Sequence, residues 1–211
     1  MFAVQNLIYK NILDIPALLI NKQITCIVGA SGSGKTTLLR MLNRLNVPDA
    51  GTVFYRGQNI AQLDTVELRR EVVMLGQTPV IYPGTIEDNL QIGLQFSQKP
   101  PATAAAMKES LSKVELDKDL TGSCHNLSGG EKQRLCLARV MLMDANVYLL
   151  DEPSSALDKD TERFVIDNLA RFVLDEDKQL VMVTHSEQIA QTFSKGIIRL
   201  GNGHVVEANH E

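Results

Sequence analysis

A short apolar run, a glycine-rich loop and a segment of helical character follow one another near the start of the chain. The run is Gln-Ile-Thr-Cys-Ile-Val at residues 23–28, and the loop is Gly-Ala-Ser-Gly-Ser-Gly-Lys-Thr at residues 29–36. The loop matches the pattern G-x-x-x-x-G-K-[ST], and the strand before it and the helix after it supply the context that this pattern requires. Its glycines let backbone N–H groups converge on a phosphate. The feature predicts an α/β fold with a mainly parallel sheet and a nucleotide at the end of one strand.

Two side chains of this loop have separate expected roles. Lys35 supplies a mobile positive charge for the β- and γ-phosphates, and Thr36 supplies a hydroxyl group for Mg²⁺. A chance glycine-rich turn rarely holds all eight positions between a strand and a helix. The nucleotide-binding residues predicted here are Gly29, Ala30, Ser31, Gly32, Ser33, Gly34, Lys35, Thr36 and Thr37.

Two further apolar runs end in polar residues. Residues 146–150 suit a central parallel strand, and Asp151 and Glu152 follow at the carboxyl end, where ligands of such sheets gather. Because neighbouring strand residues point opposite ways, we expect Asp151 to serve Mg²⁺ and Glu152 to polarise the attacking water. An acidic turn that merely closes a core strand is the alternative. Residues 179–184 end at His185, which taken alone is an ordinary strand-end residue. Together with the acids and the phosphate loop at the same edge, it is expected to contact the γ-phosphate.

A second anion site is predicted about a hundred residues after the loop. Ser128 is a good helix N-cap, and Gly129 and Gly130 leave the backbone unshielded before the helix that runs on from Glu131. The unpaired N–H groups at such a helix start attract anions. One nucleotide needs only one phosphate loop, so the second surface indicates a partner copy.

Composition narrows the class of protein. With 211 residues, 44% of them apolar and 22% charged, the chain is expected to form one globular domain. A net charge of −4 does not indicate a nucleic-acid-binding protein. No apolar run approaches the length needed to span a membrane. No signal peptide is visible, so we expect a cytoplasmic protein. Cys26, Cys124 and Cys136 fit no metal spacing and are expected to be free thiols.

Together these motifs resemble the nucleotide-binding domains of ABC (ATP-binding cassette) proteins, over nearly the whole chain. The resemblance identifies residues 29–36 as Walker A, residues 147–151 as Walker B and residues 127–131 as the signature motif. It implies a Q-loop at Gln77 and a D-loop at residues 155–158. It also implies Mg²⁺ ligands Thr36, Gln77 and Asp151, catalytic residues Glu152, His185 and Lys35, and ATP contacts from Gln77, Ser128, Gly129, Gly130, Glu131 and Asp158.

The resemblance also implies an architecture. A helical subdomain at about 77–139 is inserted into a RecA-like phosphate-loop NTPase core with an antiparallel β subdomain, formed by about 1–76 and 140–211. Met107, Leu111 and Val114 have helical spacing within it. Residues 196–207 suggest two strands around an Asn-Gly turn. Tyr9 is the candidate for stacking on adenine, although Phe2 or Tyr9 could equally be core residues.

The resemblance implies an ATP-hydrolysing subunit of a separate integral membrane permease, peripheral on the cytoplasmic face, with ATP sandwiched in a head-to-tail homodimer. Residues 78–90 lie where the family docks its permease, or form a buried turn. This stretch and the Leu-Ser-Gly-Gly-Glu-Lys-Gln-Arg run are similar to the small ATPases of the Fet-type metal exporters. The alternative is a soluble ABC ATPase in a non-transport complex, such as cofactor-cluster assembly. A phosphate-loop kinase has no use for residues 127–131.

Overall fold

Two β-sheets organise the protein in a computed structural model that describes residues 1–210, excluding the side chains of Asn209 and His210. The smaller sheet is antiparallel and has the strand order β2-β1-β4-β5. The larger sheet has the order β10-β9-β3-β8-β7-β6. The strands of the smaller sheet are β1 (Phe2–Tyr9), β2 (Leu13–Ile20), β4 (Ala50–Tyr55) and β5 (Gln58–Asn59). Those of the larger sheet are β3 (Ile24–Gly29), β6 (Val72–Leu75), β7 (Val147–Asp151), β8 (Gln179–Val183), β9 (Gly196–Gly201) and β10 (His204–His210).

The larger sheet is parallel except at one edge. Strand β3 pairs in parallel with β8 and β9, and β7 pairs in parallel with β8 and β6, whereas β10 returns antiparallel to β9 through the turn at Asn202-Gly203. Both the mainly parallel sheet and the hairpin near the C-terminus are therefore confirmed. The register places Asp151 opposite Val183, so the carboxyl ends of the parallel strands meet at one edge.

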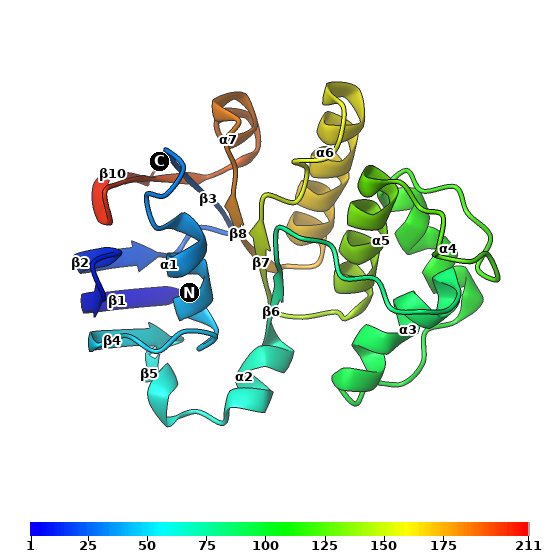
Figure 1. Cartoon of the computed structure of the whole chain (residues 1–211). Helices are drawn as coiled ribbons and strands as arrows, with labels where there is room; N and C mark the ends of the chain where they lie inside the picture. Colours follow the sequence, from blue (N-terminus) through cyan, green and yellow to red (C-terminus); the bar gives the residue numbers. More distant parts are fainter. Residues whose placement is uncertain (211) are drawn as a thin grey trace.

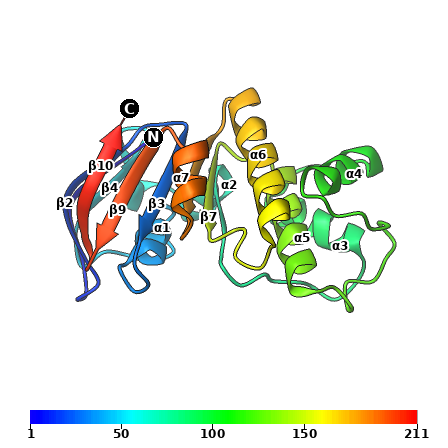
Figure 2. The ribbon, with the colours of Figure 1, turned by 90° about the horizontal axis from the view of Figure 1, so that it is seen from above.

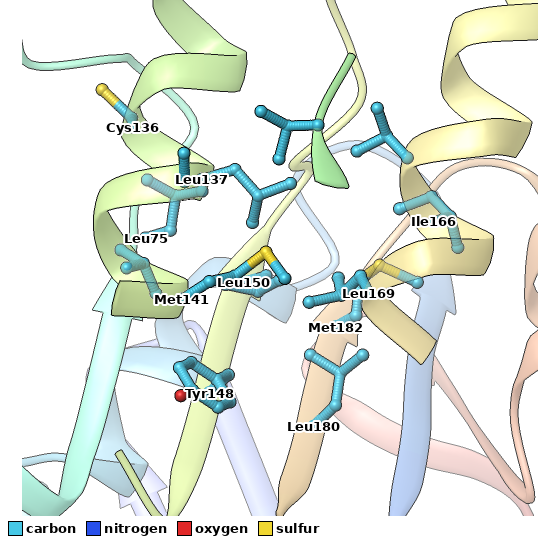
Figure 3. Close-up of a cluster of buried hydrophobic side chains, with 14 of the residues drawn as sticks. Leu75, Cys136, Leu137, Met141, Tyr148, Leu150, Ile166, Leu169, Leu180 and Met182 are labelled. Atoms are coloured by element: carbon cyan, nitrogen blue, oxygen red, sulfur yellow. The ribbon is translucent and has the colours of Figure 1, made fainter. Parts of the chain in front are cut away.

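Both faces of the larger sheet are covered, which explains its continuous apolar strands. Successive residues of a strand belong to opposite clusters: Tyr148 and Leu150 pack on one face, and Leu149 packs on the other. Figure 3 shows Tyr148, Leu150 and their neighbours on β8 lying beneath side chains of two helices. These helices are α5 (Gly129–Leu142) and α6 (Lys159–Asp175).

Helix α1 (Lys35–Leu42) packs on the other face, between the two sheets (Figure 1). Its buried Leu38 and Leu39 share a cluster with the fully buried Phe2 of the smaller sheet. The Phe2 ring lies 5.1 Å from the ring of Tyr55, centroid to centroid, so Phe2 is a core residue. This packing fixes α1, and with it the loop that precedes it.

Three helices gather at the end of the molecule remote from the antiparallel sheet (Figures 1 and 2): α3 (Ile86–Phe96), α4 (Ala104–Lys113) and α5. Met107, Leu111 and Val114 are buried against the main core, as their spacing predicts. Because α5 continues to Leu142, it runs past the boundary expected near residue 139. The division into subdomains stays a prediction, and residue 211 lies outside the described residues.

Shorter elements complete the chain: a 3-10 turn (Ile60–Gln62), α2 (Thr65–Glu71) and α7 (Glu187–Phe193). Cys26, Cys124 and Cys136 are buried free thiols, as expected. Within residues 1–210, none of the helices combines the length and apolar character needed to cross a bilayer.

Candidate functional site

The phosphate loop follows β3, and its glycines are required by the backbone. Gly29 has φ 150°, and a Cβ at this position would lie 2.2 Å from the carbonyl oxygen of Leu200. Gly34 has φ 99°, and a Cβ there would lie 2.6 Å from Cδ2 of Leu13. Both conformations are open to glycine and strained for other residues. The loop is therefore held against β9 and against the turn between β1 and β2.

Lys35 begins α1 and folds back over the loop. Its Nζ donates hydrogen bonds to the carbonyl oxygens of Gly29 (2.9 Å) and Ala30 (2.8 Å). Desolvation lowers the pKa of Lys35, while the carboxylates of Glu152 and Asp151 act in the opposite direction. The ammonium group is thus positioned at the loop by two neutral acceptors, which an incoming phosphate can replace with a contact between opposite charges.

Asp151 and Thr36 form the part of the site suited to a metal ion. Oγ1 of Thr36 donates a hydrogen bond of 3.0 Å to Oδ1 of Asp151, whose side chain is buried. Burial raises the pKa of Asp151, and the hydrogen bond from Thr36 partly offsets this rise. A buried carboxylate next to a hydroxyl group is an oxygen-donor set that Mg²⁺ prefers. The residues present fit this ion.

Glu152 lies beyond the end of β7, and the expectation that strand alternation orients it is wrong. Its φ is 51°, in the left-handed region, and its N–H donates to the carbonyl oxygen of Val183 at 3.0 Å. The strand ends at Asp151, so the turn that follows aims the Glu152 side chain. Such a conformation in a non-glycine residue costs free energy and is often found at functional sites.

The Glu152 carboxylate meets two other predicted site residues. Nε2 of Gln77 donates a hydrogen bond of 2.8 Å to Oε2, and Nε2 of His185 lies 2.6 Å from Oε1. Gln77 follows β6 and His185 follows β8, so the contacts cross three neighbouring strand ends. The structure thus brings Gln77, Asp151, Glu152 and His185 to the same sheet edge as the phosphate loop.

The signature turn forms the start of α5. Ser128 is the N-cap: its Oγ accepts a hydrogen bond from the N–H of Glu131, and the Glu131 carboxylate accepts one from the N–H of Ser128. A Cβ on Gly129 would meet nothing within 4 Å, whereas one on Gly130 would lie 3.1 Å from the carbonyl oxygen of Ala156. Gly129 therefore faces open space, and Gly130 packs closely on the D-loop.

The signature turn and the phosphate loop are not brought together within one chain. Figures 1 and 2 both show α1, which follows the phosphate loop, and α5, which follows the signature turn, on opposite sides of β7. The second anion-binding surface predicted at Ser128, Gly129 and Gly130 is thus separate from the first. It can meet the phosphates of a nucleotide bound to another molecule.

Two further predicted residues have defined positions. Asp158 caps α6, and its Oδ1 accepts hydrogen bonds from the N–H groups of Thr161 and Asp160; these bonds, chiefly those with Thr161, lower the pKa of Asp158. Tyr9 ends β1 and is partly buried, with the Lys10 ammonium 5.0 Å from its ring centroid. The hairpin turn after Tyr9 abuts the phosphate loop at Gly34. Stacking of Tyr9 on adenine stays a prediction.

Sequence reasoning missed Gln133. This residue is buried on α5; its Nε2 donates to the carbonyl oxygen of Glu152 (2.9 Å) and to Oγ of Ser155 (3.3 Å), and its Oε1 accepts from the N–H of Ala156 (2.9 Å). A signal was present, because a glutamine stands at helical spacing from the apolar positions 136, 137 and 140. A polar side chain on a buried face needs partners.

Sequence comparisons with known proteins identify the family to which this site belongs. A family model described as ABC transporter matches residues 15–155. Protein STAR1 of Oryza sativa subsp. japonica is 40% identical over 182 residues, which cover 86% of this chain and 52% of that protein. The phosphate import ATP-binding protein PstB 2 of Lactiplantibacillus plantarum is 36% identical over 202 residues, which cover 90% of this chain and 80% of that protein. The chain thus spans about half the length of STAR1.

A solved structure shows the same fold. It is the dimeric, post-hydrolysis state of the ATP-binding cassette MJ0796 bound to ADP and Pi, with 27% sequence identity and a TM-score of 0.88. The match covers 100% of this chain and 98% of that one. From the family match, the relatives and the fold together, the chain belongs to the ABC transporter family, as an ATP-binding cassette.

Proposed function

We propose that this chain hydrolyses ATP to power transport of a substrate across a membrane through a separate permease. The observation that carries the proposal is the Glu152 carboxylate held between Gln77 and His185, beside Lys35 and Asp151. Family membership supports the transport role, and the geometry of this carboxylate supports hydrolysis.

Each catalytic residue has a role that its position suits. Glu152 acts as the base or positions the attacking water, because its carboxylate stands at the sheet edge where the γ-phosphate is expected. His185 and Lys35 stabilise the charge on the transferring phosphoryl group. The 2.6 Å contact between His185 and Glu152 holds the two groups side by side.

Thr36, Asp151 and Gln77 would hold Mg²⁺. The Thr36 hydroxyl and the Asp151 carboxylate are already adjacent. Gln77 uses its Nε2 for Glu152, which leaves its amide oxygen for a cation. When bound, the ion supplies positive charge that neutralises the β- and γ-phosphate oxygens. A cation beside Asp151 also favours the ionised form of its buried carboxylate.

The complete ATP site is formed by two copies of the chain. In a head-to-tail homodimer, the phosphate loop of one copy faces Ser128, Gly129 and Gly130 of the other, and two-fold symmetry makes two equivalent sites. The separation of α1 from α5 within one chain supports this arrangement (Figure 1). Loss of the shared γ-phosphate on hydrolysis releases the two halves.

An apolar groove is the proposed docking site for the permease. Its volume is about 330 Å³, and it lies between β6, α3 and α5. Val80 is 56% exposed and Phe96 is 65% exposed at its rim, whereas Ile86 and Leu90 are buried. The stretch 78–90 therefore has an exposed first part suited to a partner helix, whereas its second part buries the side chains of Ile86 and Leu90 in the core. Docking there would hold the cassette at the membrane, on the cytoplasmic face under this proposal.

Catalysis is tested with Glu152→Gln. The variant should lose ATP turnover and accumulate as an ATP-bound dimer, because the amide cannot accept the proton but leaves the binding surfaces intact. Phosphate release and light scattering measure the two effects, with the unchanged chain as the control. Turnover at the unchanged rate by the variant would contradict the role given to Glu152.

The transport role has its own test. Affinity purification of the native complex from solubilised membranes should recover an integral membrane protein in a fixed ratio to this chain. Recovery in a soluble complex with no integral subunit would instead support the alternative of a non-transport ABC ATPase. The subfamily resemblance to Fet-type metal exporters stays a prediction that the identity of this partner would test.

A further inference from the structure

The signature turn carries its own negative charge. Glu131 occupies the third position of α5, and both of its carboxylate oxygens have partners in the same chain. Oε2 accepts a hydrogen bond of 2.8 Å from the N–H of Ser128, and Oε1 lies 2.8 Å from Nζ of Lys118. The carboxylate therefore lies at the helix start that the proposed dimer would use for a phosphate.

Two anions at one helix start oppose each other. The positive end of the helix dipole favours one negative charge within its first turn, and a second nearby anion meets repulsion. Contacts with Lys118 and Ser128 lower the pKa of Glu131 to about 2, so its carboxylate is charged at neutral pH. A γ-phosphate arriving at Ser128 and Gly129 would meet this charge unless a cation neutralised it.

Lys118 is held where it can neutralise that charge. It lies in the segment 114–128 between α4 and α5, thirteen residues before Glu131. Leu116 is buried just before it, and just after it the carbonyl oxygen of Leu120 accepts a hydrogen bond of 2.9 Å from the N–H of Glu87. Anchors on both sides of Lys118 thus bring its side chain to Glu131.

We propose that Lys118 is a positioning residue of the signature turn, whose ammonium group neutralises Glu131 so that the turn can receive the γ-phosphate of Mg-ATP bound to a second copy of this chain. The proposal rests on the head-to-tail dimer of the proposed function. It assigns Lys118 a role through Glu131, with no direct contact to the nucleotide.

The charge at position 131 decides how strongly a substitution of Lys118 affects dimer formation. A glutamine at this position keeps an amide oxygen for the N–H of Ser128 but carries no charge. In that background Lys118 has no negative charge at position 131 to neutralise. Loss of Lys118 should therefore harm dimer formation only when residue 131 is glutamate. Such dependence of one substitution on another is measured by a double-mutant cycle.

The cycle is best run in the full chain carrying Glu152→Gln, which prevents hydrolysis. The Mg-ATP concentration for half-maximal dimerisation is measured by light scattering for Lys118→Met, for Glu131→Gln and for the double variant. Lys118→Met should raise this concentration by about twofold to fivefold, because each of the two sites loses a charge effect of roughly this size and two Mg-ATP bind per dimer. The double variant should differ from Glu131→Gln by less than about 1.5-fold.

Three controls separate the charge effect from a folding effect. Lys118→Arg should restore dimerisation, since the cation is kept. Lys108→Met removes a positive charge from exposed α4 and should leave dimerisation unchanged. Binding of a fluorescent ATP analogue to the monomer, and the thermal unfolding midpoint, should be the same for Lys118→Met as for its parent, because a partly exposed ion pair adds little stability.

The outcomes are distinct. Lys118→Met could weaken dimerisation equally with the native Glu131 and in the Glu131→Gln background. That result would overturn the proposal and indicate a direct contact between Lys118 and the phosphate. No loss when the native Glu131 is present, with a parent that still dimerises, would also overturn it and leave the proposed function intact. A parent that fails to dimerise with Mg-ATP would overturn the dimer itself, and the role of Lys118 with it.

Discussion

Nε2 of Gln133 donates a 2.9 Å hydrogen bond to the main-chain carbonyl oxygen of Glu152. Gln133 belongs to α5, the helix that begins at the signature turn, and Glu152 is the proposed catalytic carboxylate. In a head-to-tail dimer the signature turn and Glu152 of one chain serve different ATP molecules. In the proposed dimer the bond would therefore connect the two composite sites through a single buried side chain.

Replacing Gln133 by alanine should weaken hydrolysis more than binding. The substitution leaves the N–H of Ala156 and the carbonyl oxygen of Glu152 without their side-chain partner, which costs about 1–3 kcal/mol of stability. It also frees the turn that aims Glu152, so we expect kcat to fall about tenfold, the size of a modest loss of alignment. Phosphate-release kinetics and nucleotide titration of the monomer check this. An unchanged kcat with lowered stability would reduce Gln133 to a structural residue.

Alanine substitutions at two glycines of the phosphate loop should differ in cost. Gly29→Ala places a Cβ 2.2 Å from the Leu200 carbonyl oxygen, whereas Gly32→Ala meets nothing within 4 Å and has only its φ of 77° against it. We expect losses of about 2–4 kcal/mol for Gly29→Ala and about 1 kcal/mol for Gly32→Ala. Urea unfolding without nucleotide measures both. Equal losses would show that the close approach to β9 does not decide the cost.

Much of the site was predictable because parallel strands end at one edge. Asp151 ends β7, whereas Gln77 and His185 follow β6 and β8, so their meeting depends on strand order and direction. The orientation of Glu152 was not predictable, because no sequence pattern indicates a φ of 51° at the residue after a strand. The pairing of Lys118 with Glu131 was hidden for another reason: it depends on the path of the loop between them.

In the absence of nucleotide, ionisation of the Asp151 carboxylate as the pH rises should lower the free energy of unfolding. Burial raises its folded-state pKa above the unfolded value. A group of this kind favours the folded state fully below the unfolded pKa, and this contribution is lost as the pH rises through the folded pKa. Asp151→Asn removes the titration and can still accept the hydrogen bond from Thr36. The variant should therefore gain stability relative to the unchanged chain at pH 7 more than at pH 4.

Urea unfolding at the two pH values, with and without Mg-ATP, checks this prediction. Mg-ATP should stabilise Asp151→Asn less than it stabilises the unchanged chain, since a neutral amide oxygen binds Mg²⁺ more weakly than a carboxylate does. Thr36→Val is a matched control, because it removes the neighbouring hydroxyl group and leaves the carboxylate to titrate. If Asp151→Asn had the same relative stability at both pH values, ionisation of the buried carboxylate would not be the cause.

Gly129→Ala should separate nucleotide binding from dimer closure. A Cβ at this position meets nothing within 4 Å in the monomer, and alanine favours the first turn of α5 more than glycine does. Stability should therefore be unchanged or higher by about 0.5–1 kcal/mol. The added methyl group nevertheless stands where the partner's γ-phosphate must approach the backbone, so we expect ATP-driven dimerisation and turnover to fall at least about tenfold. ATP binding to the monomer should not change, because the phosphate loop lies on the other side of β7 (Figure 1).

The comparison with Gly130→Ala makes the test specific: there a Cβ would lie 3.1 Å from the Ala156 carbonyl oxygen, so stability should fall as well. Normal turnover by Gly129→Ala would mean that the signature turn does not contact the nucleotide of a partner.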